Sequence, residues 1–252
     1  MAALYADTIG RGSPPLLLLH GLSVNGAVWQ PLLPALREWP GRIIIPDLRG
    51  HGRSPHVRPY ALGQHACDVA SLLNANEPVT IVGHSMGAMI GLVLASGLFG
   101  VDVAHVLALS TKVTWQEDEL VKLKQVAASP VRWFDTHAEA VERFLRVAGL
   151  AGIVDSHAAV VDVGVRSEGH RFRLAADPAT VLVVGPEFGP VLSSARARWQ
   201  LACGDNDPLV DIAELRAFDR NAVEIAGSGH NPHIQAPLAL AGLVLGALTP
   251  TL

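Results

Sequence analysis

Cysteine is scarce in this chain of 252 residues, which contains only Cys67 and Cys203. The two stand alone, without the Cys-x-x-Cys spacing of a zinc or redox motif. Their isolation argues against a disulfide framework and against a structural zinc site. An excess of basic residues is also missing, because 19 Lys and Arg stand against 23 Asp and Glu and the net charge is −4. The scattered basic residues offer no electrostatic surface for nucleic acid.

Long hydrophobic runs are absent as well, although the mean hydropathy is +0.32 and 50% of the residues are apolar. Residues 238–248 are too few to span a bilayer, and the apolar run that follows Ala88 meets Asp102 and His105. Residues 1–7 lack the basic segment and apolar stretch of a secretory signal. We therefore expect a cytoplasmic protein with no membrane span, built as one domain or as one domain with a large insertion.

Short apolar runs alternate with longer segments whose pattern is typical of helices. Such alternation predicts an α/β fold with a doubly wound, mostly parallel sheet covered on both faces. Buried strands are expected at residues 16–19, 42–45, 79–82, 103–109 and 199–202. In open parallel sheets ligands bind beyond the carboxyl ends of the strands, so the residues that follow these runs are the candidates for chemistry. They are His20-Gly21, Asp47, residues 83–87 and residues 204–207.

The alternation stops between residues 112 and 195, where charged helical stretches appear with no buried strand between them. We interpret residues 112–195 as an inserted helical cap on a core formed by residues 1–111 and 196–252. One apolar run within it, at residues 181–184, fits a strand and a helix equally well.

Gly83-His84-Ser85-Met86-Gly87 follows one of the apolar strands and precedes a run that fits a helix. This is Gly-x-Ser-x-Gly in the strand–turn–helix context of a nucleophile elbow. A serine on so sharp a turn takes strained backbone angles, and the residues two positions to either side must be small for strand and helix to approach closely. The N-terminus of that helix directs N–H groups toward a developing oxyanion. Ser85 is therefore the candidate nucleophile.

Outside the cap, the sequence resembles the α/β-hydrolase superfamily, because several of that family's motifs occur in it in the same order. A strand ends in His20-Gly21, a loop at residues 46–54 fits Asp-x-x-Gly-x-Gly-x-Ser, residues 204–207 fit Gly-x-x-Asp, and Gly229-His230 lies in a turn near the C-terminus. In that family the nucleophile, the acid and the base occur in the order Ser, Asp, His. The resemblance thus implies a catalytic triad of Ser85, Asp207 and His230.

The members of this triad would have separate roles. The Ser85 hydroxyl is a weak nucleophile at neutral pH and needs the imidazole of His230 to take its proton, while Asp207 orients that imidazole and stabilises its charged form. Two neighbours are alternatives: Asp205 lies on the same loop as Asp207, and His233 lies close to His230. The simpler interpretation of Asp205 is that it caps or bonds the loop.

The resemblance also implies an oxyanion hole formed by the backbone N–H groups of Leu22 and Met86. Four nearby polar residues are expected to hold loops together rather than to transfer protons: His20, Asp47, His51 and His84. No cofactor and no metal is expected, because the chain has no His-Glu-x-x-His motif, no phosphate-binding loop, and only His230 and His233 as close potential ligands.

The serine at the elbow disfavours haloalkane dehalogenases and epoxide hydrolases, which use aspartate there. Met86 stands where prolyl iminopeptidases usually have Trp, which weakens a peptidase interpretation. Carboxylesterases, lactonases, thioesterases, carbon–carbon bond hydrolases and cofactor-free haloperoxidases stay open. The broadest prediction is a carboxylesterase-type serine hydrolase that acts on a small-molecule acyl substrate through an acyl-enzyme. The alternative of a different class is a non-catalytic ligand receptor, although such receptors generally lose a triad member.

Substrate selectivity depends on the cap and the loops rather than on the fold. Aromatic residues of the cap either line a pocket or pack in its interior: Trp115, Trp133, Phe134, Phe144 and Phe188. Three arginines would suit a substrate carboxylate if they turned inward, but they fit a solvent-exposed surface better: Arg166, Arg171 and Arg173. We therefore expect the cap to cover Ser85 and to favour uncharged, largely apolar acyl groups.

Overall fold

A seven-stranded sheet forms the centre of the computed structural model, which describes residues 3–185 and 187–248. The strand order is β1-β3-β2-β4-β5-β8-β9, and neighbouring strands are parallel except for β1 and β3. The strands are β1 (Ala6–Ile9), β2 (Leu16–Leu19), β3 (Ile43–Pro46), β4 (Val79–His84), β5 (Val103–Leu109), β8 (Arg198–Gly204) and β9 (Val223–Ile225). The predicted α/β fold with a mostly parallel sheet is confirmed, and the half-exposed edge strand β1 is an addition to it.

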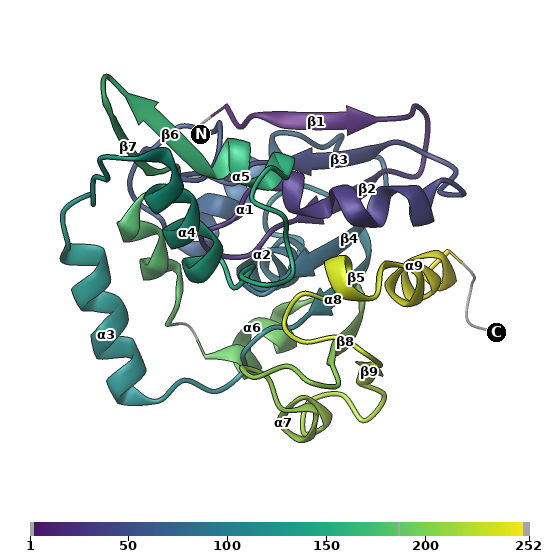
Figure 1. The fold of residues 1–252 in the computed structure, drawn as a ribbon. Helices are drawn as coiled ribbons and strands as arrows, with labels where there is room; N and C mark the ends of the chain where they lie inside the picture. Colours follow the sequence, from purple (N-terminus) through teal and green to yellow (C-terminus); the bar gives the residue numbers. More distant parts are fainter. Residues whose placement is uncertain (1–2, 186, 249–252) are drawn as a thin grey trace.

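Helices cover both faces of this sheet (Figure 1). One face carries η1 (Gly26–Leu36), α8 (Pro232–Gln235) and α9 (Pro237–Gly246), and the other carries α1 (Leu62–Ala70), α2 (Met86–Leu94) and α6 (Phe188–Ser194). The short helix α7 (Ile212–Arg216) packs against β8. Strand β2 shows how the sequence specifies this arrangement, because Leu16 and Leu18 pack with η1 and Leu17 and Leu19 pack with α2. A strand buried on both faces needs an apolar residue at every position.

The segment between β5 and β8 contains helices, as the sequence predicts, and also a β-hairpin. They are α3 (Glu117–Ala128), α4 (His137–Val147), α5 (Ala159–Gly164), β6 (Val165–Glu168), β7 (Arg171–Leu174), η2 (Pro178–Val183) and α6. The β6–β7 hairpin was not predicted, because its charged and half-exposed residues lack the apolar alternation of a buried strand. In the ambiguous run at residues 181–184, residues 181–183 form the end of the 3-10 helix η2 and Val184 follows it with extended backbone angles.

Helix α3 stands at the outer edge of this segment (Figure 1). It begins with a capping box, in which Glu119 accepts a hydrogen bond from the Gln116 backbone N–H, and three acidic residues occupy its first turn. Ala127 is the only residue of α3 that is buried, and the helix packs mainly against η2. The helix is therefore attached to the rest of the protein through a short 3-10 helix.

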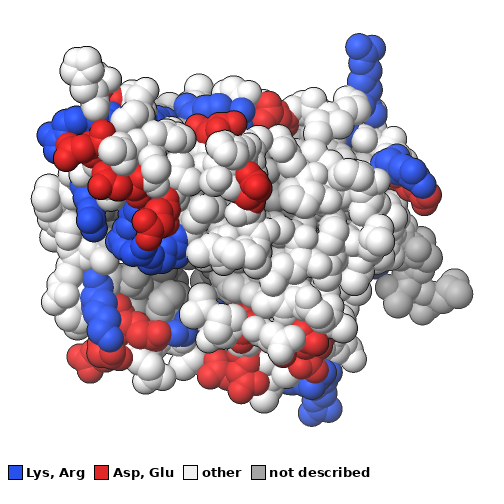
Figure 2. Space-filling model, in the orientation of Figure 1, with Lys and Arg blue, Asp and Glu red and all other residues white. Residues whose placement is uncertain are grey.

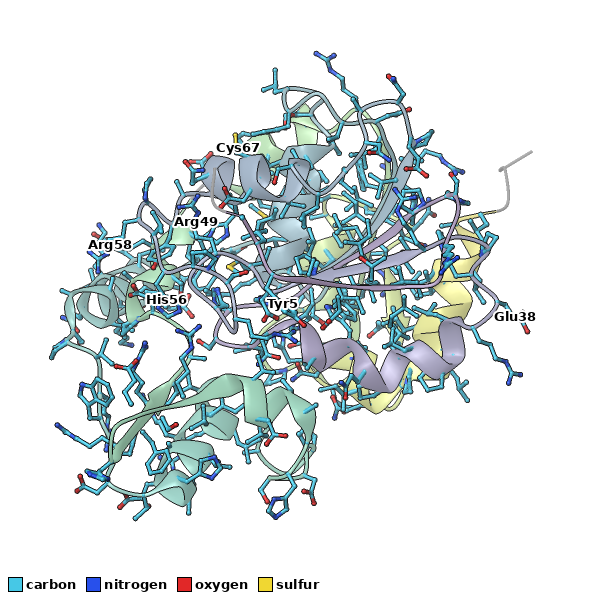
Figure 3. The ribbon with its side chains drawn as sticks, turned by 90° about the horizontal axis from the view of Figure 1, so that it is seen from above. Tyr5, Glu38, Arg49, His56, Arg58 and Cys67 are labelled. Carbon is cyan, nitrogen blue, oxygen red and sulfur yellow. The ribbon has the colours of Figure 1, made fainter. Side chains whose placement is uncertain are left out.

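The loop between β3 and α1 fastens the start of η2 to the sheet. The backbone N–H of Asp177 donates to the carbonyl of Gly50 at 2.9 Å, and the hydroxyl of Tyr60 donates to the Asp177 carboxylate at 2.8 Å. Figure 3 shows this loop, marked by Arg49 and Arg58, beside the segment between β5 and β8. Among the helices of residues 3–185 and 187–248, none is both long enough and apolar enough to cross a bilayer.

Candidate active site

Ser85 lies at the junction of β4 and α2 in a backbone conformation that few non-glycine residues adopt, with φ 51° and ψ −112°. Its backbone N–H donates to the carbonyl of Leu109 at 2.8 Å, which anchors the turn to the neighbouring strand β5. The two glycines of the motif are required by contact. A Cβ atom at Gly83 would lie 2.3 Å from the Gly87 carbonyl oxygen, and one at Gly87 would lie 2.2 Å from the Leu19 carbonyl oxygen. The local sequence therefore specifies a turn that presents the serine side chain beyond the sheet.

The structure brings His230 and Asp207 together at the same end of the sheet. The ring Nδ1 of His230 lies 3.1 and 3.0 Å from the two carboxylate oxygens of Asp207. The Asp207 side chain has no solvent exposure, and the His230 side chain is 18% exposed. Their loops touch closely, because a Cβ atom at Gly204 would lie 2.2 Å from the Gly229 carbonyl oxygen. An imidazole that donates from Nδ1 to a carboxylate keeps Nε2 free to accept a proton.

The two alternative residues make different contacts. Asp205 accepts hydrogen bonds from the Ser228 backbone N–H at 3.1 Å and from the Asn206 side chain at 2.8 Å. The backbone hydrogen bonds from Gly227 and Ser228 lower the pKa of this carboxyl. His233 is completely buried with its ring centroid 4.7 Å from that of Trp29, and burial lowers its pKa to about 3. These contacts fit loop bonding for Asp205 and a packing role for His233.

A cleft of about 470 Å³ opens at Ser85. Leu22 and Met86, whose N–H groups the resemblance assigns to the oxyanion hole, both line it. Met86 is the first residue of α2, where backbone N–H groups have no acceptor within the helix. Of the aromatic residues in the segment between β5 and β8, Trp115 lines this cleft, while Phe134, Phe144 and Phe188 are buried in the hydrophobic core.

His84 holds a loop of the site, as the sequence predicts, but through a partner that the sequence did not reveal. Its Nε2 donates to the backbone carbonyl of His230 at 2.8 Å, and the two ring centroids lie 4.9 Å apart. Burial lowers the pKa of His84 well below the usual range, so the ring is neutral. The contact joins residues 146 positions apart. No local sequence pattern predicts this hydrogen bond, because the residues around His84 would be the same whether or not its ring bonded to a distant loop.

Polar residues hold the loops around the site, as the sequence predicts for His20 and Asp47. His20 accepts from the Leu48 backbone N–H at 2.8 Å and donates to the Gly21 carbonyl at 2.7 Å. The Asp47 carboxylate accepts from the Gly26 backbone N–H at 2.7 Å and from Arg53 at 2.7 and 2.8 Å. Burial opposes ionisation of Asp47, but the hydrogen bonds from Arg53 outweigh it and lower the pKa of the carboxyl.

Arg166, Arg171 and Arg173, which the sequence offers as candidates for binding a substrate carboxylate, contact other groups of the protein. Arg166 donates to the backbone carbonyl of Gly52, and Arg173 pairs with Glu168 at 2.7 Å. Arg171 and Arg173 also lie over the ring of Trp133, at 5.5 and 5.8 Å from its centroid. None of the three lines the cleft at Ser85. Within the described part of the chain, no group of three or more His, Cys, Asp or Glu could hold a metal ion.

Several curated proteins share parts of this sequence. The chain is 36% identical over 96 residues to Lipase LipV of Mycobacterium tuberculosis, a stretch that covers 37% of this chain and 36% of that protein. It is 32% identical over 160 residues to the pimeloyl-[acyl-carrier protein] methyl ester esterase of Edwardsiella ictaluri, covering 60% of this chain and 58% of that protein. The matched stretches thus span about a third to three fifths of the length of these relatives.

Solved structures share the fold over almost the whole chain. The thioesterase domain from the curacin biosynthetic pathway superposes with a TM-score of 0.78 at 23% identity, covering 97% of this chain and 95% of that one. E-2-(acetamidomethylene)succinate hydrolase superposes with a TM-score of 0.80 at 22% identity and the same coverage. The sequence pattern of the alpha/beta hydrolase family matches residues 16–243. The chain belongs to the alpha/beta hydrolase family.

Proposed function

We propose that this chain is a serine hydrolase that cleaves carboxylic esters or related acyl bonds through an acyl-enzyme. The observation that carries the proposal is the strained serine of the β4–α2 turn, whose neighbour His84 bonds to the backbone of a histidine that is itself hydrogen-bonded to a buried carboxylate. A serine held in this conformation costs free energy, and such strain is concentrated at functional sites. Among the relatives, a lipase and a methyl ester esterase support hydrolysis of an acyl bond.

In the proposed mechanism, Ser85 Oγ attacks the carbonyl carbon of the substrate while His230 Nε2 takes the hydroxyl proton. The negative charge that develops on the carbonyl oxygen is stabilised by the backbone N–H groups of Leu22 and Met86. His230 then gives its proton to the leaving alcohol as the tetrahedral intermediate collapses to the acyl-enzyme. Water, which gives a proton to His230, then attacks the acyl carbon; the bond to Ser85 Oγ breaks, Oγ takes up the proton and the carboxylic acid is released. Asp207 holds the imidazole in the tautomer that this requires, and it stabilises the imidazolium.

We further propose that residues 112–195 act as a cap that selects largely apolar acyl groups. Trp115 and the end of η2 line the cleft at Ser85, and the arginines of the β6–β7 hairpin are occupied elsewhere. Thioesters, lactones and activated carbon–carbon bonds present a similar carbonyl to the same groups, so these substrates are alternatives. A ligand receptor on this scaffold is the alternative outside catalysis.

A hydrolysis screen tests the proposed function. Wild-type protein and Ser85→Ala are assayed on p-nitrophenyl acetate and butyrate, a lactone, a thioester and a vinylogous diketone. We expect the p-nitrophenyl esters to be hydrolysed, and Ser85→Ala to reduce this turnover by several orders of magnitude at an unchanged melting temperature. Undiminished turnover in well-folded Ser85→Ala would refute the mechanism. Binding of these compounds without turnover by the wild type would favour the receptor.

A further inference from the structure

A second cavity, of about 1,070 Å³, lies apart from the cleft at Ser85. Its walls come from α3, the loop that follows α3, α4, β7 and η2, and the core contributes Ser23 to it. In Figure 2 the face is hollowed between the positions that α3 and α4 occupy in Figure 1. The cavity is larger than the cleft in which the proposed chemistry takes place.

Three exposed valines converge on this cavity. Val126 of α3 is 45% exposed, and Val131 and Val147 are each 39% exposed. Single exposed valines are ordinary on a protein surface, but several that line one hollow mark a place where an apolar ligand would remove them from water. Leu174 and Val181 add half-buried apolar surface to the same wall.

Two of the three charged residues that line the cavity, Asp177 and Arg132, are engaged with other groups of the protein. Asp177 accepts hydrogen bonds from the Tyr60 hydroxyl at 2.8 Å and from the Ala179 backbone N–H at 2.8 Å. The Arg132 guanidinium lies over the ring of Phe134, 4.9 Å from its centroid. Arg132 and Arg143 also line a neighbouring polar cleft with acidic residues of α4. The surface left for a ligand is therefore mainly apolar, which fits an uncharged chain.

The cavity and the cleft share a wall. Leu22 lines the cleft and Ser23 lines the cavity, while on η2 Val183 lines the cleft and Val181 lines the cavity. The cavity thus begins one residue from the N–H group proposed to hold the carbonyl oxygen of the substrate. In the part of the wall formed by η2, Ala179, Thr180 and Val183 are buried, whereas Val181, on the cavity side, is only half-buried.

We propose that this second cavity binds the apolar chain of an acyl substrate, which passes between Ser23 and Val181 while its carbonyl group lies at Ser85. The substrate class is therefore linear medium- and long-chain acyl esters rather than short ones. This inference rests on the proposed hydrolase function. Each methylene buried in the cavity raises kcat/KM roughly fourfold, whereas short acyl groups stay in the cleft and gain nothing from it.

Two valines of α3 provide a matched pair of variants. Val126 lines the cavity, whereas Val121 is similarly exposed, at 47%, on a surface of the same helix that does not line it. The substitution Val126→Trp fills the cavity with an indole, and Val121→Trp adds the same side chain elsewhere. We expect Val126→Trp to lower kcat/KM for p-nitrophenyl decanoate at least tenfold and to leave p-nitrophenyl acetate within twofold. Val121→Trp should change neither, and Val147→Trp, from the opposite wall, should reproduce the effect of Val126→Trp.

Binding without catalysis separates this inference from the proposed function. 2-Dodecanone is an uncharged chain that no hydrolase can cleave, and its binding to the Ser85→Ala variant can be measured by calorimetry. We expect it to bind Ser85→Ala and Ser85→Ala/Val121→Trp equally, and Ser85→Ala/Val126→Trp at least tenfold more weakly. Equal binding by all three proteins, or an equal loss of acetate and decanoate hydrolysis in Val126→Trp, would overturn the inference. A wild type that hydrolyses no ester but shows the expected binding pattern would contradict the proposed function alone.

Discussion

Asp207 and Asp205 lie two positions apart on one loop, yet only Asp207 contacts His230. Both residues follow a strand and could serve as the acid of the triad, and in the sequence only the Gly-x-x-Asp spacing favours Asp207. The structure supplies a physical difference between them. Asp207 is buried against the imidazole, whereas Asp205 bonds to the backbone of the following turn.

We predict that Asp207→Asn lowers kcat for ester hydrolysis about 10⁴-fold, because an amide at this position stabilises the wrong imidazole tautomer. Asp205→Asn should keep kcat within tenfold, since it removes only loop hydrogen bonds. Steady-state kinetics of the two variants on p-nitrophenyl butyrate make the comparison. Full activity in Asp207→Asn together with loss of activity in Asp205→Asn would show that the acid is misassigned.

At the scale of elements, the parts of the fold that depend on local sequence were predictable. The β4–α2 turn was recognised because small residues at fixed positions are needed for strand and helix to touch, and strand β2 because every position in it is apolar. The β6–β7 hairpin was missed because its strands are half-exposed and charged. Its stability depends on packing against α4, which no local pattern records.

Two helical glycines test the requirement for close contact at the turn. Gly87→Ala should unfold the protein or lower its free energy of unfolding by several kcal/mol, because its Cβ would lie 2.2 Å from the Leu19 carbonyl oxygen and the chain has to shift. Gly242→Ala in α9 meets nothing within 4 Å and should raise that free energy by about 0.5–1 kcal/mol through helix propensity. Urea denaturation of both variants measures the difference. Equal stability of Gly87→Ala and the wild type would disprove the contact argument.

At the scale of the whole molecule, several histidines are buried where distant segments of the chain pack together. Burial lowers the pKa of six of them: His20, His51, His65, His84, His105 and His233. The sequence placed His20, His51 and His84 in structural roles, but it could not show which rings lose all contact with water. Burial depends on how segments from the whole chain pack, and His84 reaches His230 only through that packing.

These histidines make stability depend on pH. A histidine whose pKa is lower in the folded than in the unfolded protein binds fewer protons when folded, so its unfavourable effect grows as pH falls below about 6.5. His65 is the clearest case, because burial lowers its pKa to about 4 and neither ring nitrogen has a hydrogen-bond partner in the described residues. Its contribution should reduce the free energy of unfolding by about 2 kcal/mol between pH 7.5 and pH 5.0.

We predict that His65→Met makes the free energy of unfolding less sensitive to pH. The loss between pH 7.5 and pH 5.0 should be about 2 kcal/mol smaller than in the wild type, since methionine does not titrate. His157→Met replaces an exposed histidine and should leave the loss unchanged. Urea titrations at the two pH values measure both variants. The burial argument fails if the two variants show the same pH dependence.

The most direct test of the central claim is the site of covalent labelling. Wild-type protein is treated with a fluorophosphonate at pH 8, digested, and its peptides are analysed by mass spectrometry. We predict one adduct per chain, on Ser85, that is absent from Ser85→Ala and forms at least a hundredfold more slowly in His230→Ala, because the serine then lacks its base. An adduct on another serine would contradict the account. So would wild-type protein that takes up no label and hydrolyses esters as fast after fluorophosphonate treatment as before it.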